Sequence, residues 1–205
     1  MNAALVTVIL GLGLAVTVVR RRSAAIALVA AQSLVLSGGA FTLAAGRSSQ
    51  FLVASIVLAT KAVVLPALLA ALGRRTPEPR LVAAARGPLV RLAIAGAVAL
   101  MVSAAMPRLG LSSAHTEHVS VALVLVGIAI VATRRPALHQ LIGLIVAENG
   151  LSLLAVSVPG GLSWVIELGA LLDLVLVVTV AAAFVQRIHT ELGTGDTELL
   201  RGLRG

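Results

Sequence analysis

The chain has no cysteine, no tyrosine and a single tryptophan, Trp164. Without cysteine it cannot hold disulfides, iron–sulfur clusters or thiolate metal sites, so any redox chemistry must belong to a partner. The sequence also lacks a nucleotide-binding fingerprint, a nucleophile elbow and a zinc-binding helix motif. We therefore expect a non-catalytic chain that carries no cofactor of its own.

Charged residues are scarce, at 12% of the chain, whereas 59% of the residues are hydrophobic and the mean hydropathy is +1.08. A soluble domain has roughly 45–50% apolar and about 25% charged residues, so this composition favours lipid as the solvent. The net charge of +8 does not indicate a nucleic-acid partner, because the basic residues form short clusters between apolar runs without interleaved aromatics. The composition predicts an all-α, polytopic membrane helix bundle in contact with the lipid bilayer.

Apolar runs of about 20 residues, the length that crosses a bilayer as a helix, recur along the chain. About seven transmembrane helices are predicted, over residues 2–19, 23–45, 51–72, 88–105, 119–133, 136–158 and 162–186. Pro88 and Pro136 mark helix starts, and the Pro159-Gly160-Gly161 turn makes the last two spans an antiparallel hairpin. The predicted organisation is a three-helix membrane segment (1–75), a cytoplasmic loop (76–87), a four-helix membrane segment (88–190) and a cytoplasmic tail (191–205).

The arginines are distributed unevenly between the two sides of the predicted bundle. One set of alternate connections carries most of them, namely Arg20, Arg21, Arg22, Arg74, Arg75, Arg80, Arg86, Arg91, Arg134, Arg135, Arg187, Arg201 and Arg204. The opposite connections carry only Arg47 and Arg108. By the positive-inside rule, we expect a multi-pass cell-membrane protein with its amino terminus outside and its carboxyl terminus in the cytoplasm.

Four ionisable residues of the predicted spans stand out as candidates for a function: Lys61, Glu148, Glu167 and Asp173. An ionisable side chain at the middle of a bilayer costs at least about 2.5–3.5 kcal/mol on insertion scales, so such a residue usually has a partner or a function. These four are the candidate ion-translocation residues.

The predicted hairpin places two of the acids at the same depth. Glu148 and Asp173 are about equally far along the chain from Gly160, and equal residue counts at about 1.5 Å per residue give equal heights. Two close carboxylates in a low dielectric cannot both ionise readily, so one is expected to hold a proton unless a cation such as Lys61 lies between them. This is the chemistry of a proton relay. In the alternative interpretation, Lys61 pairs with one acid and the pair only fixes helix packing.

Two other groups of polar residues allow more than one interpretation. Residues of the predicted second span either line a hydrated path or form interhelical hydrogen bonds, namely Gln32, Ser33 and Ser37. Residues of a predicted outer loop resemble a metal cluster only loosely, namely His115, Glu117 and His118. Because zinc sites usually need further ligands, we interpret this loop as solvated and predict no metal site.

The carboxyl-terminal third carries a family resemblance. Its motifs are Leu-Ile-Gly-Leu-Ile-Val-Ala-Glu-Asn-Gly over residues 141–150, Ile-Glu-Leu-Gly-Ala-Leu-Leu-Asp over residues 166–173, and Arg-Ile-His over residues 187–189. Over residues 134–205 the chain resembles the hydrogenase-4 component E family. The ending of that family is similar to the membrane subunit K of respiratory complex I and to the C subunit of multisubunit sodium/proton antiporters. The chain departs from the subunit K pattern at Ile145, where those relatives have an acid, and Glu148 follows one turn later.

The resemblance implies a membrane subunit of a complex I-like or group 4 [NiFe]-hydrogenase-like assembly. In such an assembly, hydrophilic hydrogenase-like or dehydrogenase-like partners carry the metal clusters and antiporter-like membrane subunits carry ions. Glu148 and Asp173 then take the places of the intramembrane acids in the two hairpin helices. We expect this chain to assist proton translocation that is coupled to redox chemistry in its partners. The alternatives are a subunit of a cation/proton antiporter without a redox partner, and a purely structural membrane scaffold.

Overall fold

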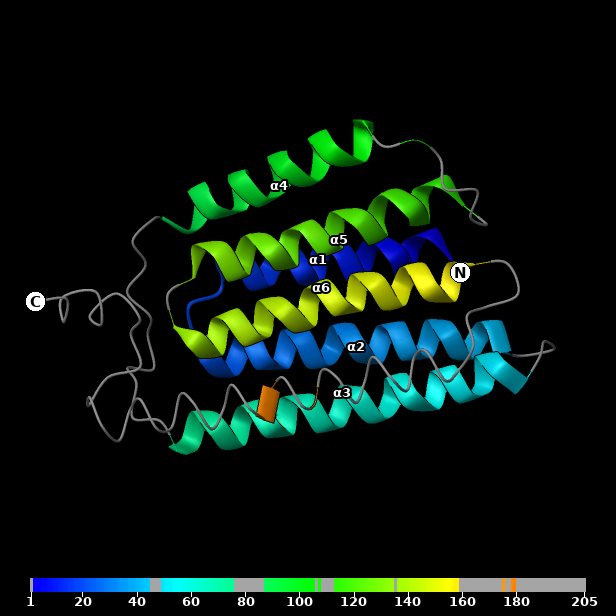
Figure 1. Ribbon diagram of the computed structural model, residues 1–205, viewed down its shortest axis with the longest axis horizontal. Helices are drawn as coiled ribbons and strands as arrows, with labels where there is room; N and C mark the ends of the chain where they lie inside the picture. The colour runs from blue at the N-terminus through cyan, green and yellow to red at the C-terminus, as the bar shows by residue number, and fades with distance from the viewer. Residues whose placement is uncertain are drawn as a thin grey trace, which may run out of the picture.

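A computed structural model describes residues 2–44, 49–75, 87–105, 107, 113–134, 136–158, 175, 178 and 179 of the chain (Figure 1). In this part the chain forms six α-helices: α1 (Ala3–Val18), α2 (Arg22–Ala44), α3 (Ser49–Arg75), α4 (Pro88–Ala105), α5 (Ala114–Thr133) and α6 (Ala137–Ser157). The all-α prediction is confirmed here, and each helix overlaps one predicted span. The predicted seventh span, over residues 162–186, lies almost wholly outside the described residues, so the count of seven stays a prediction.

Four of the helices contain stretches long and apolar enough to cross a membrane: Arg22–Leu43, Ser55–Arg74, Ala114–Thr133 and Ala137–Ser157. α1 and α4 are apolar but shorter. The 16 residues of α1 extend about 24 Å at 1.5 Å per residue, somewhat less than the roughly 30 Å hydrocarbon core of a bilayer.

The helices run alternately in opposite directions and pack side by side (Figure 1). α5 lies beside α6, α2 lies beside α3, and α1 lies among α2, α4 and α5 (Figure 1). Two contacts between α1 and α5 fix their common direction: Thr7 Oγ1 lies 3.2 Å from His115 Nε2 near the start of both helices, and Arg134 Nη2 lies 2.6 Å from the carbonyl oxygen of Val19 at their other end. Helices from both predicted membrane segments therefore share one bundle.

The outer surface of the bundle differs from that of a typical soluble protein, in which most large apolar side chains point inwards. Large apolar side chains are exposed on the outside of the bundle, among them Phe41, Val63, Leu89, Leu100 and Met101. The interior also contains apolar side chains, but several polar ones are fully or almost fully buried with them, among them Gln32, Ser33, Lys61 and Asn149.

Pro66 lies inside α3, little more than one turn after Lys61. Proline has no backbone N–H, so the carbonyl group of Ala62 lacks the donor that an α-helix normally provides. The helix nevertheless continues to Arg75.

Candidate functional site

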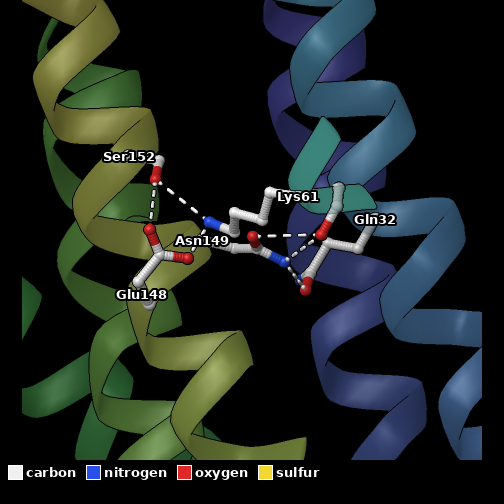
Figure 2. Close-up of polar contacts among 6 residues, drawn as sticks. Gln32, Lys61, Glu148, Asn149 and Ser152 are labelled. Carbon is white, nitrogen blue, oxygen red and sulfur yellow. Dashed lines mark hydrogen bonds and ion pairs between the residues drawn. The ribbon is translucent and has the colours of Figure 1, made fainter. Parts of the chain in front are cut away.

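The interior of the bundle holds an ion pair between Lys61 of α3 and Glu148 of α6 (Figure 2). Ser152, one turn after Glu148 on α6, contacts both groups. Its hydroxyl accepts a hydrogen bond from Lys61 Nζ at 3.3 Å and donates one to Glu148 Oε1 at 3.0 Å. An ammonium, a carboxylate and a hydroxyl from two helices thus form a closed triangle.

This triangle lies deep in the bundle. The Lys61 side chain is 1% exposed and the Glu148 side chain 14% exposed. Glu148 lies near the middle of the 21 residues of α6, which places it about 14–17 Å from either end of the helix at 1.5 Å per residue. At such a depth an unpaired charge is costly, and the pairing of Lys61 with Glu148 offsets that cost.

A second group of polar side chains lies next to the triangle, on the side of α6 that faces α2 (Figure 2). Asn149 Nδ2 donates to Gln32 Oε1 at 2.9 Å and to Ser33 Oγ at 3.0 Å. The Ser33 hydroxyl in turn donates to Asn149 Oδ1 at 3.1 Å. Gln32 Nε2 in turn donates to the carbonyl oxygen of Ile9 on α1 at 2.9 Å. Because Glu148 and Asn149 are consecutive, one turn of α6 bonds directly to α3 and α2, and through Gln32 it is linked to α1.

Glycines on α5 and α6 determine which side of α6 is free for these polar contacts. A Cβ atom added at Gly127 would lie 2.4 Å from the backbone nitrogen of Ala147, and one added at Gly150 would lie 2.8 Å from the carbonyl oxygen of Ser120. The two helices therefore approach at backbone distance, as small residues allow in membrane helix pairs. With this side of α6 against α5, Glu148 and Asn149 point towards α3 and α2.

The triangle contains the groups that a proton relay needs. Transfer of a proton from the Lys61 ammonium to the Glu148 carboxylate would neutralise both, which a low dielectric favours over two separated charges. The Ser152 hydroxyl both accepts and donates a hydrogen bond, so it can pass a proton between the other two groups. The Asn149 and Gln32 amides hold no titratable proton, and their hydrogen bonds join α6 to α2 and α2 to α1.

Of the four predicted ion-translocation residues, the structure brings Lys61 and Glu148 together. Glu167 and Asp173 lie outside the described residues, so the equal depth of Glu148 and Asp173 stays a prediction. The described geometry contains the one-acid pairing that the sequence allowed, with Lys61 as the partner of Glu148.

The second-span polar residues form interhelical hydrogen bonds, which was one of their two interpretations. Gln32 and Ser33 bond to Asn149, and Ser37 Oγ donates to the carbonyl oxygen of Ser55 on α3 at 3.0 Å. Sequence reasoning missed Ser152. Its signal was its spacing, because residues i and i+4 of a helix lie on one face and Ser152 follows Glu148 by one turn.

The prediction of a loop around His115 is wrong, because these residues form the beginning of α5, although His115 and His118 are exposed there. α5 begins at Ala114 rather than at the predicted Val119, and Glu117 is buried there, at 4% exposure. An acidic residue in the first turn interacts favourably with the helix dipole, which explains why the polar stretch is helical. Within the described residues, no group of three or more His, Cys, Asp or Glu side chains is placed to hold a metal ion.

Comparison with known proteins finds a relative of this chain. The uncharacterized protein Rv0085 of Mycobacterium tuberculosis is 31% identical to this chain over 157 aligned positions, and the match covers 72% of this chain and 70% of the relative. No family model matches the chain. No solved structure matches it either.

Proposed function

This chain belongs to the same family as Rv0085, and we propose that it is an integral membrane subunit that assists proton translocation through its buried Lys61–Glu148 pair. The pair is the observation that carries the proposal. Intramembrane ionisable residues mark proton and ion pathways by default, and here an acid, a base and a bridging hydroxyl lie within hydrogen-bonding reach of one another.

The placement in a membrane is supported by two features. Four helices have the length and the apolar composition for a crossing. Large apolar side chains point outwards while the charged pair is buried, which is the arrangement expected when lipid is the solvent. We place the arginine-rich end of the bundle in the cytoplasm and the amino terminus outside, as the positive-inside rule predicts.

The proposed context is a complex I-like or group 4 [NiFe]-hydrogenase-like assembly, on the basis of the resemblance over residues 134–205. In this proposal the chain is not itself an enzyme and carries no cofactor. Its partners are antiporter-like membrane subunits and hydrophilic hydrogenase-like or dehydrogenase-like subunits. Glu148 and Lys61 then contribute one relay step, and the proposed path continues to Asp173 and Glu167.

The test has two parts. The full-length chain, tagged in its native host, is purified with its partners, and the preparation is analysed for iron and nickel. Proton uptake per electron transferred is then measured in vesicles that contain the purified complex. Co-purified iron or nickel is expected, and Glu148→Gln should lower the number of protons per electron without preventing assembly.

A double variant, Lys61→Met with Glu148→Gln, separates a relay from a purely structural pair. Because it removes both charges, no unpaired charge remains buried, and the packing of the helices should be preserved. In the relay proposal, this variant assembles and still pumps fewer protons. Full pumping by the double variant would leave the structural scaffold as the explanation. Purification with antiporter-like subunits alone, without iron or nickel, would instead indicate a cation/proton antiporter.

A further inference from the structure

A second group of buried cationic and imidazole side chains belongs to the arginine-rich end of the bundle. At this end α1 and α5 end and α4 and α6 begin, as the ribbon in Figure 1 shows. We call Arg91, Arg134 and His139 the basic cluster. They are 3%, 3% and 0% exposed, respectively. They lie well away from the Lys61–Glu148 pair, which is near the middle of the helices.

Part of Arg134 has a structural role. Its Nη2 donates to the carbonyl oxygens of Val16, Thr17 and Val19 at 3.3, 2.9 and 2.6 Å. These carbonyl groups belong to the carboxyl-terminal end of α1, where an α-helix leaves its last acceptors unpaired and a cation is favourable.

Most of the other polar atoms of the basic cluster are buried without a hydrogen-bond partner. In the described structure these atoms are Nε and Nη2 of Arg91, Nε and Nη1 of Arg134, and both ring nitrogens of His139. A buried donor without an acceptor costs roughly 1–3 kcal/mol, and more when it carries a charge, so native structures rarely retain several at one place without a ligand.

The cluster also lacks a compensating negative charge among the described residues. The acids of this part of the chain are Glu117, at the opposite end of α5, and Glu148, near the middle of α6. Burial, together with the positive charges of Arg91 and Arg20, lowers the pKa of Arg134 to about 10. Several positive groups therefore lie close together in a buried place, and a bound anion would satisfy both their charge and their free N–H groups.

We propose that the basic cluster binds the phosphate group of an anionic phospholipid at the cytoplasmic edge of the membrane. The guanidinium fork matches phosphate oxygens, and basic pockets between membrane helices on the cytoplasmic side are suited to anionic headgroups. Leu89 and Val90, which directly precede Arg91 in α4, are 74% and 50% exposed and provide an apolar surface for an acyl chain. The inference rests on the proposed placement of the chain in a membrane.

Lipid binding is tested with the purified full-length protein in detergent. Phosphatidylglycerol, phosphatidylcholine and inorganic phosphate are added separately, and native mass spectrometry and thermal unfolding measure retention and stabilisation. Phosphatidylglycerol should remain bound and raise the unfolding temperature. Arg91→Gln should weaken its binding about tenfold, because it removes charge-assisted hydrogen bonds.

Arg74→Gln is the matched control, because Arg74 is an exposed arginine at the same end of the bundle. It should leave lipid binding unchanged. Arg134→Lys keeps a positive charge but loses the fork, and it should also bind phosphatidylglycerol more weakly.

Three results would overturn the inference. Equal retention of phosphatidylcholine would show that the phosphate charge is not recognised, and equal losses in Arg91→Gln and Arg74→Gln would show a nonspecific surface effect. Stabilisation by inorganic phosphate with no retained lipid would assign the site to a free anion. None of these results involves proton movement, so they leave the Glu148→Gln pumping test to decide the proposed function separately.

Discussion

Replacing Glu148 with glutamine leaves the Lys61 ammonium, which is 1% exposed, without its carboxylate partner. Removing one member of a buried ion pair costs about 3–5 kcal/mol, since the other charge remains in a low dielectric. This range is consistent with the cost of at least about 2.5–3.5 kcal/mol for an unpaired charge at mid-bilayer. We therefore expect Glu148→Gln to lower the free energy of unfolding by about 3–5 kcal/mol.

The two single variants should differ in size. Lys61→Met leaves Glu148, which is 14% exposed and still accepts a hydrogen bond from Ser152, so its loss should be smaller. The double variant removes both charges and should lie within about 1 kcal/mol of the original chain. The coupling energy between the two positions should then be about 3 kcal/mol or more.

The assay is reversible unfolding in mixed detergent and dodecyl sulfate micelles, followed by far-ultraviolet circular dichroism. Thr60→Val is the control, because Thr60 is exposed and its hydroxyl bonds only to the carbonyl oxygen of Ile56 in its own helix. It should change the free energy by no more than about 0.5 kcal/mol. Additive effects of the two single variants, or a loss below about 1 kcal/mol for Glu148→Gln, would refute the reasoning.

Three further variants test other parts of the bundle by the same unfolding measurement. Gly127→Ala should destabilise by about 1–3 kcal/mol, because its Cβ would lie 2.4 Å from a backbone nitrogen of α6; Gly11→Ala, with nothing within 4 Å, should not destabilise. Asn149→Ala removes two interhelical donor bonds and should cost about 1–2 kcal/mol; no loss would show that the amide does not hold α2 against α6. Arg134→Gln should cost about 1–3 kcal/mol through the lost contacts at the end of α1, whereas an equal loss in Arg74→Gln would contradict that cause.

The helices could be predicted because their signal is local. Pro88 begins α4 and Pro136 directly precedes α6. Proline is favoured at a helix start because the backbone N–H that it lacks would have no partner there. The start of α5 could not be predicted, because residues 114–118 are mostly polar and hydropathy alone excludes them from a span. Burial of Glu117 depends on neighbouring helices, which no local pattern reveals.

The site could be predicted in its residue types but not in its pairing. Lys61 and Glu148 were recognisable because charges are rare in apolar spans. Which helix faces Lys61 depends on how α6 is rotated, and that rotation is set by the approach at Gly127 and Gly150 to α5. The packing of α6 against α5 therefore turns Glu148 towards α3, where it pairs with Lys61. The predicted contribution of Asp173 concerns residues beyond the described part of the chain.

Pro66 has a consequence for how the site could respond to protonation. The carbonyl group of Ala62, next to Lys61 in the chain, has no helical N–H to bond, so bending of α3 at this level breaks no backbone hydrogen bond there. A tilt of one half of α3 would therefore change the separation of the lysine and the glutamate at little cost to the helix.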